Sequence, residues 1–354
     1  MRSFITFSLL VALVVAAPFR SIMKLLLKFS LLLLLGLATA APNKSEDDDE
    51  TVVVTKEFFP TQFIKYKSQH DIVNIIVPLN SFNFDENDSS EDLDITFFFV
   101  EADIDENKQR TYKGLYVFKD NKATKILENG RDAAASSDDS RQVFLGAQDG
   151  LYEYKADTNE AVKYGSITDS IIGMAVTNVS DIIYILTEDY VLYKVTDKGT
   201  TKTKVEEVED AQQIVLDHSN NLYFYAEDKQ PYVYDGDEVK KIEGLPANPT
   251  DVNLIKPPII IDDGVPFIVD NIAYIIYANG TSEPSGFEFK PKAKPTAYGM
   301  EGTVIQYFAI NKKIYEYNLL AMVLGELLDE FKSILEGKDE IRTRARSGVR
   351  WVVR

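Results

Sequence analysis

The chain has 354 residues, 45% of them hydrophobic and 11% aromatic, so it can bury the core of one large domain or two smaller ones. It contains no Cys and two His residues, which excludes disulfides, thiolate sites and a His-rich metal centre; any metal would be a hard cation held by oxygen atoms. The formal net charge of −18 argues against nucleic acid as a partner, because a phosphate backbone requires a basic surface.

Residues 1–41 have the pattern of a cleaved secretory signal, present as two tandem copies. The second copy, "MKLLLKFSLLLLLGLATAAP", starts at Met23 and contains the cleavage sequence Ala38-Thr39-Ala40. Each apolar run is short for a membrane span. We therefore expect a secreted, extracellular protein with Met23 as a candidate functional start and no stable membrane insertion after cleavage. A two-helix membrane anchor is the alternative.

An acidic segment, residues 42–50, follows the signal, and a second acidic cluster lies at residues 85–92. Neither has the spacing of a calcium-binding loop, so both are expected to be solvated, and residues 42–50 to be flexible. Four N-x-S/T sequences fit a secreted chain and are candidate glycosylation sites: Asn43, Asn87, Asn178 and Asn279.

A repeat of about 40 residues dominates the rest of the chain. Its clearest copy, "VFLGAQDGLYEYK" (143–155), has an apolar run, a tight Gly turn and a second run rich in tyrosine. β-branched and aromatic runs separated by such turns are typical of consecutive hairpins. The aromatic residue near the end of the second run recurs every 36 to 43 residues, at Phe118, Tyr154, Tyr193, Tyr234, Tyr277 and Tyr317.

A period near 40 with about four short strands per unit predicts an all-β fold, a six-bladed β-propeller over residues 51–318. Residues 171–177 are an example of an inner strand and residues 160–165 of an outer strand. The inner strand of the second unit is the weakest, because "RDAAASSDDS" (131–140) hardly resembles a strand. A β-sandwich of regular hairpins is the alternative.

The sixth unit ends at Asn318 without an outer strand of its own. The apolar segment "TVVVTKEF" (51–58) is expected to supply that strand and to pair beside residues 313–317. Such N-terminal strand closure would join the first and last blades and remove a sheet edge.

Residues 319–354 have a different character from the repeats. "LLAMVLGELLDEFKSILEG" has helical spacing, and a basic tail containing Trp351 follows it. We expect a short appended helix and tail outside the propeller, with binding of lipid or of a partner by the helix as an alternative.

No catalytic motif is present, and the prediction is that the protein is not an enzyme. His218 and Asp217 are adjacent, so on a strand their side chains would point to opposite faces; His218 is better interpreted as a turn residue. The chain has no G-x-S-x-G, no H-E-x-x-H and no phosphate-binding Gly loop. We predict no cofactor and no metal ligands.

Without catalytic motifs, binding becomes the expected role. In a propeller, loops gather around a central channel that the starts of the innermost strands usually line. Those starts offer apolar surface and a few polar groups, which would suit a flat organic ligand, although a plain propeller core would present the same mixture. The candidate ligand-binding residues are Asp169, Ile172, Gln213, Asp251, Tyr298 and Met300.

The chain resembles ommochrome-binding proteins in the sequence pattern of its repeats, with the closest likeness over residues 110–250. The segments that carry the resemblance are "VFLGAQDGLYEYKADTNEAVKYG" (143–165) and "LYFYAEDKQPYVYDGDEVKKIEGLP" (222–246). These are secreted haemolymph proteins of moths and butterflies that carry tryptophan-derived pigments. The resemblance implies a non-enzymatic carrier of a planar aromatic pigment, and it assigns no ligand-contacting residue. Tyr and Phe side chains are abundant for stacking, but the acidic chain would need local cations or N–H groups to bind a carboxylated pigment.

Two other functions remain open. "DHSNNLY" (217–223) is similar to the Asp-x-x-Gly-Asn-Leu-Tyr phrase of the gluconolactonase and senescence-marker group, with Asn220 in place of Gly. That likeness would imply a metal-dependent lactonase or esterase. An interaction scaffold without a small ligand is the third possibility. The sequence does not indicate the oligomeric state.

Overall fold

The computed structural model describes residues 51–78 and 95–318, apart from residues 107, 137, 139, 141, 179–180, 258–260, 262 and 302–304. The expected signal (1–41), the acidic segments (42–50 and 85–92) and the C-terminal helix and tail (319–354) lie outside the described residues, as do Asn43 and Asn87. Apart from Asn318, the described residues belong to one compact unit, Leu27–Tyr317.

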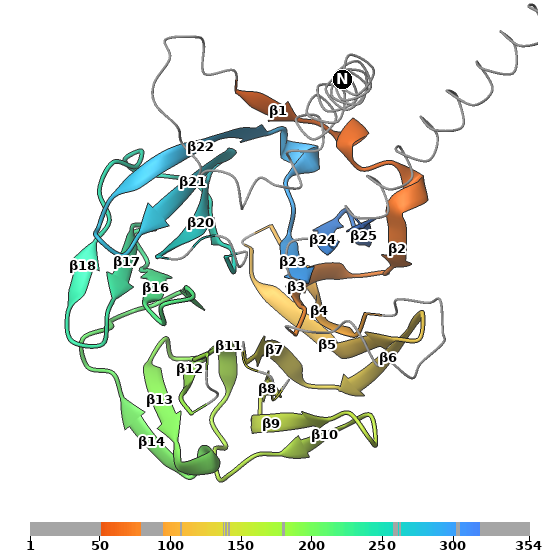
Figure 1. Ribbon diagram of the computed structural model, residues 1–354, viewed down its shortest axis with the longest axis vertical. Helices are drawn as coiled ribbons and strands as arrows, with labels where there is room; N and C mark the ends of the chain where they lie inside the picture. The colour runs from red at the N-terminus through yellow and green to blue at the C-terminus, as the bar shows by residue number, and fades with distance from the viewer. Residues whose placement is uncertain are drawn as a thin grey trace, which may run out of the picture. The chain divides into compact units, whose positions relative to one another are not determined.

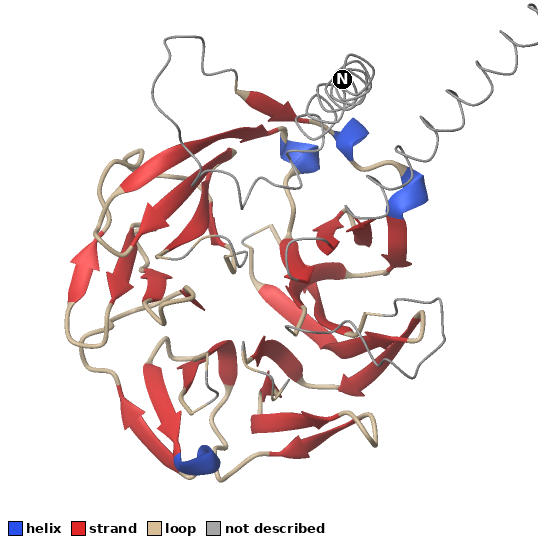
Figure 2. Ribbon diagram, in the orientation of Figure 1, coloured by secondary structure: helices blue, strands red, loops and turns tan. Residues whose placement is uncertain are grey.

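Within this unit, six sheets of mainly antiparallel strands are arranged in a ring, which is a six-bladed β-propeller (Figures 1 and 2). Five blades have four strands, and blade 5 has a fifth. The predicted fold class is confirmed.

Blades 1–3 follow one another in the chain, each running from its inner strand to its outer strand. Blade 1 contains β3 (Asp71–Ile76), β4 (Phe97–Ile104), β5 (Arg110–Lys119) and β6 (Lys122–Leu127). Blade 2 contains β7 (Gly130–Ala135), β8 (Val143–Ala147), β9 (Gly150–Lys155) and β10 (Glu160–Lys163). Blade 3 contains β11 (Ile171–Val176), β12 (Ile183–Thr187), β13 (Leu192–Thr196) and β14 (Thr201–Lys204).

Blades 4–6 have the same order, and the last two each take a strand from the N-terminal side. Blade 4 contains β15 (Gln213–Leu216), β16 (Leu222–Tyr225), β17 (Pro231–Tyr234) and β18 (Val239–Lys241). Blade 5 contains β19 (Val252–Leu254), β20 (Gly264–Val269), β21 (Ile272–Tyr277), β22 (Ser282–Phe289) and β1 (Val52–Val54). Blade 6 contains β23 (Ala297–Glu301), β24 (Ile305–Ile310), β25 (Lys313–Asn318) and β2 (Ile64–Lys67). Short 3-10 turns occur at η1 (Lys56–Phe58), η2 (Thr61–Phe63), η3 (Asp197–Gly199) and η4 (Pro291–Ala293).

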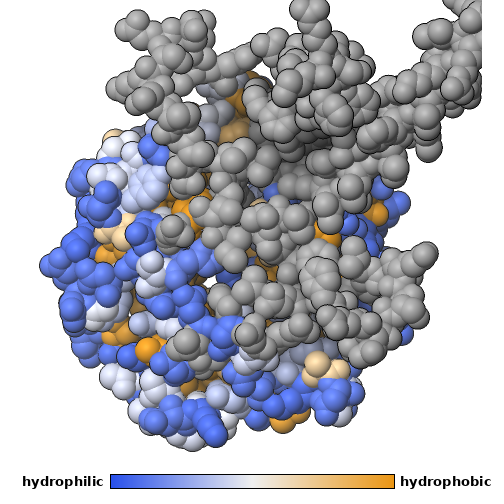
Figure 3. All heavy atoms as spheres, in the orientation of Figure 1, coloured by the Kyte–Doolittle hydropathy of each residue, from blue (hydrophilic) through white to orange (hydrophobic). Residues whose placement is uncertain are grey.

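The local sequence explains the burial of each strand. The second strands β8 and β12 are buried at every residue, because their apolar runs face a neighbouring blade on both sides. The outer strand β14, with the sequence TKTK, is exposed throughout. On the side shown in Figure 3, hydrophilic residues cover most of the outer parts of the described blades.

The ring is closed by an N-terminal strand, but not by the predicted one. Residues 52–54 form β1, which pairs in parallel with β22 of blade 5. Residues 64–67 form β2, which pairs with β25 and completes blade 6. Phe59 lies between the two strands and packs on Tyr315 at 5.5 Å between ring centroids. The prediction that residues 51–58 pair beside residues 313–317 is therefore wrong. Residues 64–67, which come later in the chain, pair with β25 instead.

The predicted aromatic repeat lies on the third strand of every blade, although not in one register. Phe118, Tyr234 and Tyr277 pair with the first residue of the preceding strand. Tyr193 instead pairs with Ile185, the third residue of its neighbour. Tyr193 is thus displaced by two residues, and Val195 occupies the position expected for it.

The second unit does have an inner strand. Residues 130–135, with the sequence GRDAAA, form β7, and Ala133, Ala134 and Ala135 are buried. Their small side chains let β7 pack closely between the neighbouring blades, which explains why the segment lacks the large residues of a typical strand.

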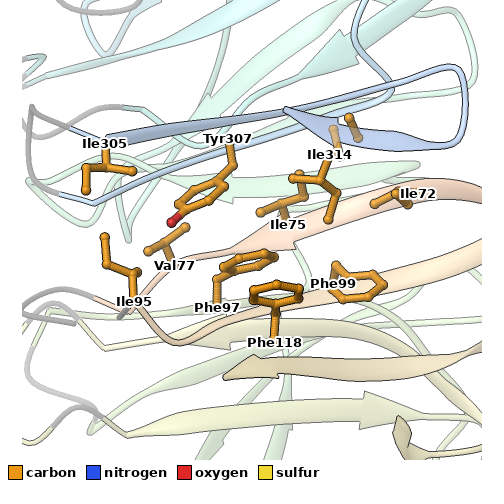
Figure 4. Close-up of a cluster of buried hydrophobic side chains, with 12 residues drawn as sticks. Ile72, Ile75, Val77, Ile95, Phe97, Phe99, Phe118, Ile305, Tyr307 and Ile314 are labelled. Atoms are coloured by element: carbon orange, nitrogen blue, oxygen red, sulfur yellow. The ribbon is translucent and has the colours of Figure 1, made fainter. Parts of the chain in front are cut away.

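The core consists of apolar layers between adjacent blades. Figure 4 shows the layer between blades 6 and 1, where Phe97 packs on Phe118 and Tyr307 with ring centroids 4.8 and 4.5 Å apart. Burying an aromatic or Ile side chain contributes about 1.5–3 kcal/mol, so each layer adds substantially to the stability of the ring. Corresponding layers lie between blades 1 and 2, 2 and 3, 3 and 4, and 4 and 5.

Candidate ligand-binding site

Each inner strand begins at the same end of the ring as the turn between the second and third strands, because neighbouring strands in a blade are antiparallel. We call this end the hairpin face. The candidate residues Asp169, Gln213 and Asp251 lie at the starts of inner strands, and therefore on this face.

The β4–β5 hairpin extends beyond its blade on the hairpin face. The two strands pair from Phe97 and Phe118 to Ile104 and Arg110, and Lys108 lies in the turn beyond them. Lys108 Nζ forms an ion pair with Asp251, which directly precedes β19 of blade 5. The hairpin thus joins blade 1 to blade 5.

Five side chains from five blades are linked by electrostatic interactions: Arg110, Asp132, Tyr190, Tyr225 and Asp251. The charge of Arg110 acts on both Asp132 and Tyr225. Tyr225 also interacts electrostatically with Asp251 and Tyr190. We call these five residues the central group.

Asp132 connects the inner strands of three blades. Its carboxylate accepts hydrogen bonds from the Asn74 side chain of β3, from Met174 N of β11 at 2.6 Å and from Ala133 N at 2.9 Å. Burial raises the pKa of Asp132 to about 7, against the opposing effects of these hydrogen bonds and of Arg110. Asp132 is therefore a brace between blades.

Asp251 is held by two lysines, Lys108 from blade 1 and Lys294 from the segment that precedes β23 of blade 6. Burial alone would raise the pKa of Asp251, but the hydrogen bonds and charges of both lysines outweigh it and the pKa is lowered. Asp251 thus remains ionised and links blade 5 to the hairpin and to blade 6.

Tyr190 is an exposed aromatic residue in an unfavourable backbone conformation. Its φ is +61°, and 43% of the residue is exposed. A large side chain rarely adopts this conformation, but the corresponding turn residues Lys108 and Lys229 also have positive φ, so the conformation belongs to the turn type of the repeat. Blade 2 has Gly150, with a φ of +129°, in the corresponding turn. Tyr190 therefore presents an aromatic ring where another copy of the repeat has none.

The other predicted ligand-binding residues do not join the central group. Asp169 forms an ion pair with Lys202 of the outer strand β14, at 2.7 Å. Gln213 makes two hydrogen bonds with the backbone of Leu254, at 2.9 and 3.0 Å, and so braces β15 against β19. Ile172 packs in the apolar layer between blades 3 and 4.

Tyr298 and Met300 both lie on the inner strand β23. Tyr298 is buried and packs on Phe308 at 4.9 Å between ring centroids, and within the described structure its hydroxyl has no hydrogen-bond partner. Met300 is half-buried and pairs with Gln306 of β24. Of the six candidates, the structure brings only Asp251 into the central group.

His218 lies in a turn, as predicted. Asp217 accepts hydrogen bonds from Ser219 N, Asn221 N and Asn221 Nδ2 at 2.8 to 2.9 Å, and from Tyr223 OH at 3.1 Å. Asn220 has a φ of +65°, the left-handed conformation that favours glycine, which explains how it replaces Gly in this phrase. In this structure the Asp217 carboxylate stabilises its own turn.

Sequence reasoning missed Arg110, Asp132, Tyr190 and Tyr225. Two signals were present: the run from residue 96 to 119 is long for one hairpin, and Tyr190 stands in a turn position where the clearest repeat has Gly.

Within the described ranges, no group of three or more His, Asp or Glu side chains is arranged to hold a metal ion. None of the helices in those ranges is both long and apolar enough to cross a membrane.

Comparisons with known proteins give structural likeness only. No protein-family model matches the sequence, and no curated protein matches it. A Bacteroides thetaiotaomicron protein of unknown function is 13% identical, with a TM-score of 0.48 over 71% of this chain and 70% of that chain. A protein provisionally assigned as a gluconolactonase is 7% identical, with a TM-score of 0.47 over 72% of this chain and 90% of that chain.

A third solved structure with some likeness is PorZ, a bacterial surface component of the type-IX secretion system of Porphyromonas gingivalis. It is 12% identical, with a TM-score of 0.43 over 72% of this chain and 38% of PorZ. At these identities and TM-scores the similarities assign no function, and the six-bladed fold rests on the sheet topology of the chain itself.

Proposed function

We propose that this protein is a secreted, non-enzymatic carrier that binds a planar aromatic ligand at the central group of the hairpin face. The proposal is supported by the exposed ring of Tyr190 in the β12–β13 turn and by the electrostatic interactions of Tyr225 with Arg110 and Tyr190, which come from three different blades. Tyrosine rings can stack on a flat ligand, and a guanidinium can stack on it or donate hydrogen bonds.

The carboxylates of the central group already have structural partners. Asp132 accepts three hydrogen bonds, and Asp251 is paired with two lysines. Tyr225 packs in the layer between blades 4 and 5, so the exposed groups left to contact a ligand are Tyr190 and Arg110, which favours the carrier over a hydrolase with convergent acids. The resemblance to ommochrome-binding proteins suggests an ommochrome-like haemolymph pigment as the ligand.

Titration of the purified protein with an ommochrome pigment tests the proposal. We expect stoichiometric quenching of tyrosine emission that excess chelator leaves intact. Substitution of Tyr190 by Ala should weaken binding by roughly threefold to tenfold, the value of one aromatic contact. Tyr193→Ala, on the outer part of the same blade, serves as the control and should bind as the wild type does.

The outcome that contradicts the carrier is turnover of a lactone or ester that is lost on chelation and restored by a divalent ion. Absence of both pigment binding and turnover would leave the scaffold function.

Secretion is tested separately: the N-terminus of the secreted protein should lie near Ala41 or Pro42, after the Ala38-Thr39-Ala40 sequence.

A further inference from the structure

Tyr190 differs from every other tyrosine of the chain in its exposure. All 19 tyrosines lie within the described residues, and every one except Tyr190 is buried or half-buried. Tyr190 is 43% exposed. Its hydroxyl forms no hydrogen bond with a described residue, whereas the hydroxyl of the half-buried Tyr234 donates to the Gly236 carbonyl oxygen at 2.7 Å. Tyr190 therefore offers the most accessible phenol oxygen of the propeller.

The turn that carries Tyr190 lies on the hairpin face, between β12 and β13. Its three consecutive residues Glu188, Asp189 and Tyr190 are all exposed. A backbone hydrogen bond from Tyr190 N to the Thr187 carbonyl oxygen, at 2.9 Å, fixes the turn. An enzyme can therefore reach the Tyr190 hydroxyl without unfolding the blade.

The charge next to Tyr190 distinguishes it further. Glu188 and Asp189 occupy the two positions before it, and no other tyrosine of the chain follows two consecutive acids. Glu188 accepts a hydrogen bond from Ser170 at 2.7 Å and lies 3.3 Å from Arg131. Asp189 has no ion pair with a described residue. The carboxylate beside the tyrosine is thus not compensated by a cation of the propeller.

An exposed tyrosine beside acidic residues suits the enzymes that sulfate tyrosine in the secretory pathway. These enzymes hold a polyanionic sulfate donor, so their active sites are basic and attract acidic substrates. We infer that Tyr190 is a sulfation site of this protein. The inference goes beyond ligand binding but rests on the proposed secretion, because the enzyme acts in the secretory pathway. A sulfate ester adds a fixed negative charge to the exposed ring that the proposed carrier uses.

The reaction is the transfer of one sulfuryl group to the phenol oxygen of Tyr190. This oxygen attacks the sulfur atom of a nucleotide phosphosulfate, which is the activated sulfate donor. An O–S bond forms, the bond between sulfur and the phosphate oxygen of the donor breaks, and the nucleotide leaves with its phosphate. The phenol proton passes to a base of the enzyme, so no oxidant or reductant takes part.

The test is peptide mapping by mass spectrometry of the full chain, secreted by a eukaryotic cell line that contains tyrosine sulfotransferase and freed of N-glycans by enzyme. The wild type should carry a sulfate, resistant to alkaline phosphatase, on the peptide that contains Tyr190. Tyr190→Phe should abolish this sulfate. Asp189→Asn should lower its occupancy by roughly threefold or more, because the basic enzyme is attracted less strongly. Thermal unfolding verifies that each variant is folded.

Tyr234→Phe is the matched control, because Tyr234 also stands beside an acid, Asp235, but is half-buried with its hydroxyl engaged. This variant should carry as much sulfate as the wild type. A secreted wild type without sulfate, a phosphate in its place, or a sulfate that persists in Tyr190→Phe would overturn the inference but not the carrier. Retention of the chain inside the cell would overturn the secreted carrier and the inference together.

Discussion

At the scale of single residues, some of the tight turns contain glycines with positive φ angles. A Cβ atom at Gly150, where φ is +129°, would lie 2.1 Å from the carbonyl oxygen of Ile167. Gly236 has a φ of +107°, but no atom lies within 4 Å of its Cβ position. Replacing Gly150 by Ala would therefore lose stability through both backbone strain and a steric clash, whereas replacing Gly236 would lose it through backbone strain alone.

Gly150→Ala should lower the free energy of unfolding by more than about 1 kcal/mol, because it adds both costs. Gly236→Ala should have the smaller effect, because only the backbone conformation opposes it. Urea unfolding monitored by circular dichroism measures both values. Equal losses in the two variants would show that the contact with Ile167 is relieved at little cost.

Asp132 predicts a pH dependence of stability. Burial raises its pKa in the folded protein to about 7 from the ordinary value of 3.8, so the folded state holds this proton more tightly than the unfolded chain does. The contribution of Asp132 to the free energy of unfolding should therefore be greatest below about pH 4, decrease as the pH rises to about 7, and stay constant above it.

Urea unfolding of wild type and Asp132→Asn between pH 5 and pH 8 tests this expectation. The wild type should lose stability relative to the variant as the pH rises to about 7. Asp235→Asn is the control: hydrogen bonds from the Glu238 and Asp237 backbone and from Lys240 lower the Asp235 pKa to about 2, so its difference from wild type should be constant over this range. A constant difference for Asp132→Asn would contradict the raised pKa.

At the scale of elements, four successive blades share a Tyr–Lys pair between the third and outer strands. The Lys125 and Lys163 ammonium groups lie 5.5 and 4.3 Å from the ring centroids of Tyr116 and Tyr152. Such contacts cover the tyrosine rings where the blades meet solvent. The pairs are Tyr116–Lys125, Tyr152–Lys163, Tyr193–Lys204 and Tyr232–Lys241.

The closing strand β2 should matter more for stability than β1. Tyr66 of β2 packs on Phe99 at 4.9 Å between ring centroids and donates a hydrogen bond to Glu101 at 3.2 Å, so β2 ties blade 6 to blade 1. A chain that starts at Lys56 loses only β1 and should unfold cooperatively. A chain that starts at Ser68 also loses β2 and should show a much lower midpoint in thermal unfolding.

Circular dichroism during heating measures both midpoints against that of a chain that starts at Ala41. Equal midpoints for the two shortened chains would show that β2 does not hold the ring closed. The physical reason for the expected difference is that loss of β2 exposes a strand edge of blade 6 and the apolar layer beneath it.

At the scale of the whole molecule, the proposed secretion leads to a prediction about glycosylation. Asn279 is exposed in the turn between β21 and β22, and its side-chain oxygen accepts from Thr281 N and Oγ1. Asn178 uses its Nδ2, the atom that would carry a glycan, to donate to the His218 carbonyl oxygen at 2.5 Å. Asn279 should therefore be occupied more fully than Asn178.

Peptide mapping of the secreted protein by mass spectrometry measures the occupancy of each site. Asn279→Gln should remove one glycan, and Asn178→Gln should change the mass distribution little. Full occupancy of Asn178 with an empty Asn279 would contradict this order.

The sequence alone determined the number of blades, because each blade is built from consecutive hairpins and the contacts that form them are local. Period, strand type and turn residues therefore predicted the six units, and the turn containing His218. The weak segment at residues 130–135 was harder to predict, since its alanines are suitable for an inner strand only when neighbouring blades pack against them.

Only the tertiary structure decided which N-terminal segment closes the ring and which side chains from different blades interact. Residues 52–54 and 64–67 are both plausible strands, and the choice between them depends on the packing of Phe59 and Tyr66 against blades 6 and 1. The central group collects residues from five blades, up to 141 positions apart between Arg110 and Asp251. Such contacts arise from closure of the ring, which local periodicity does not encode.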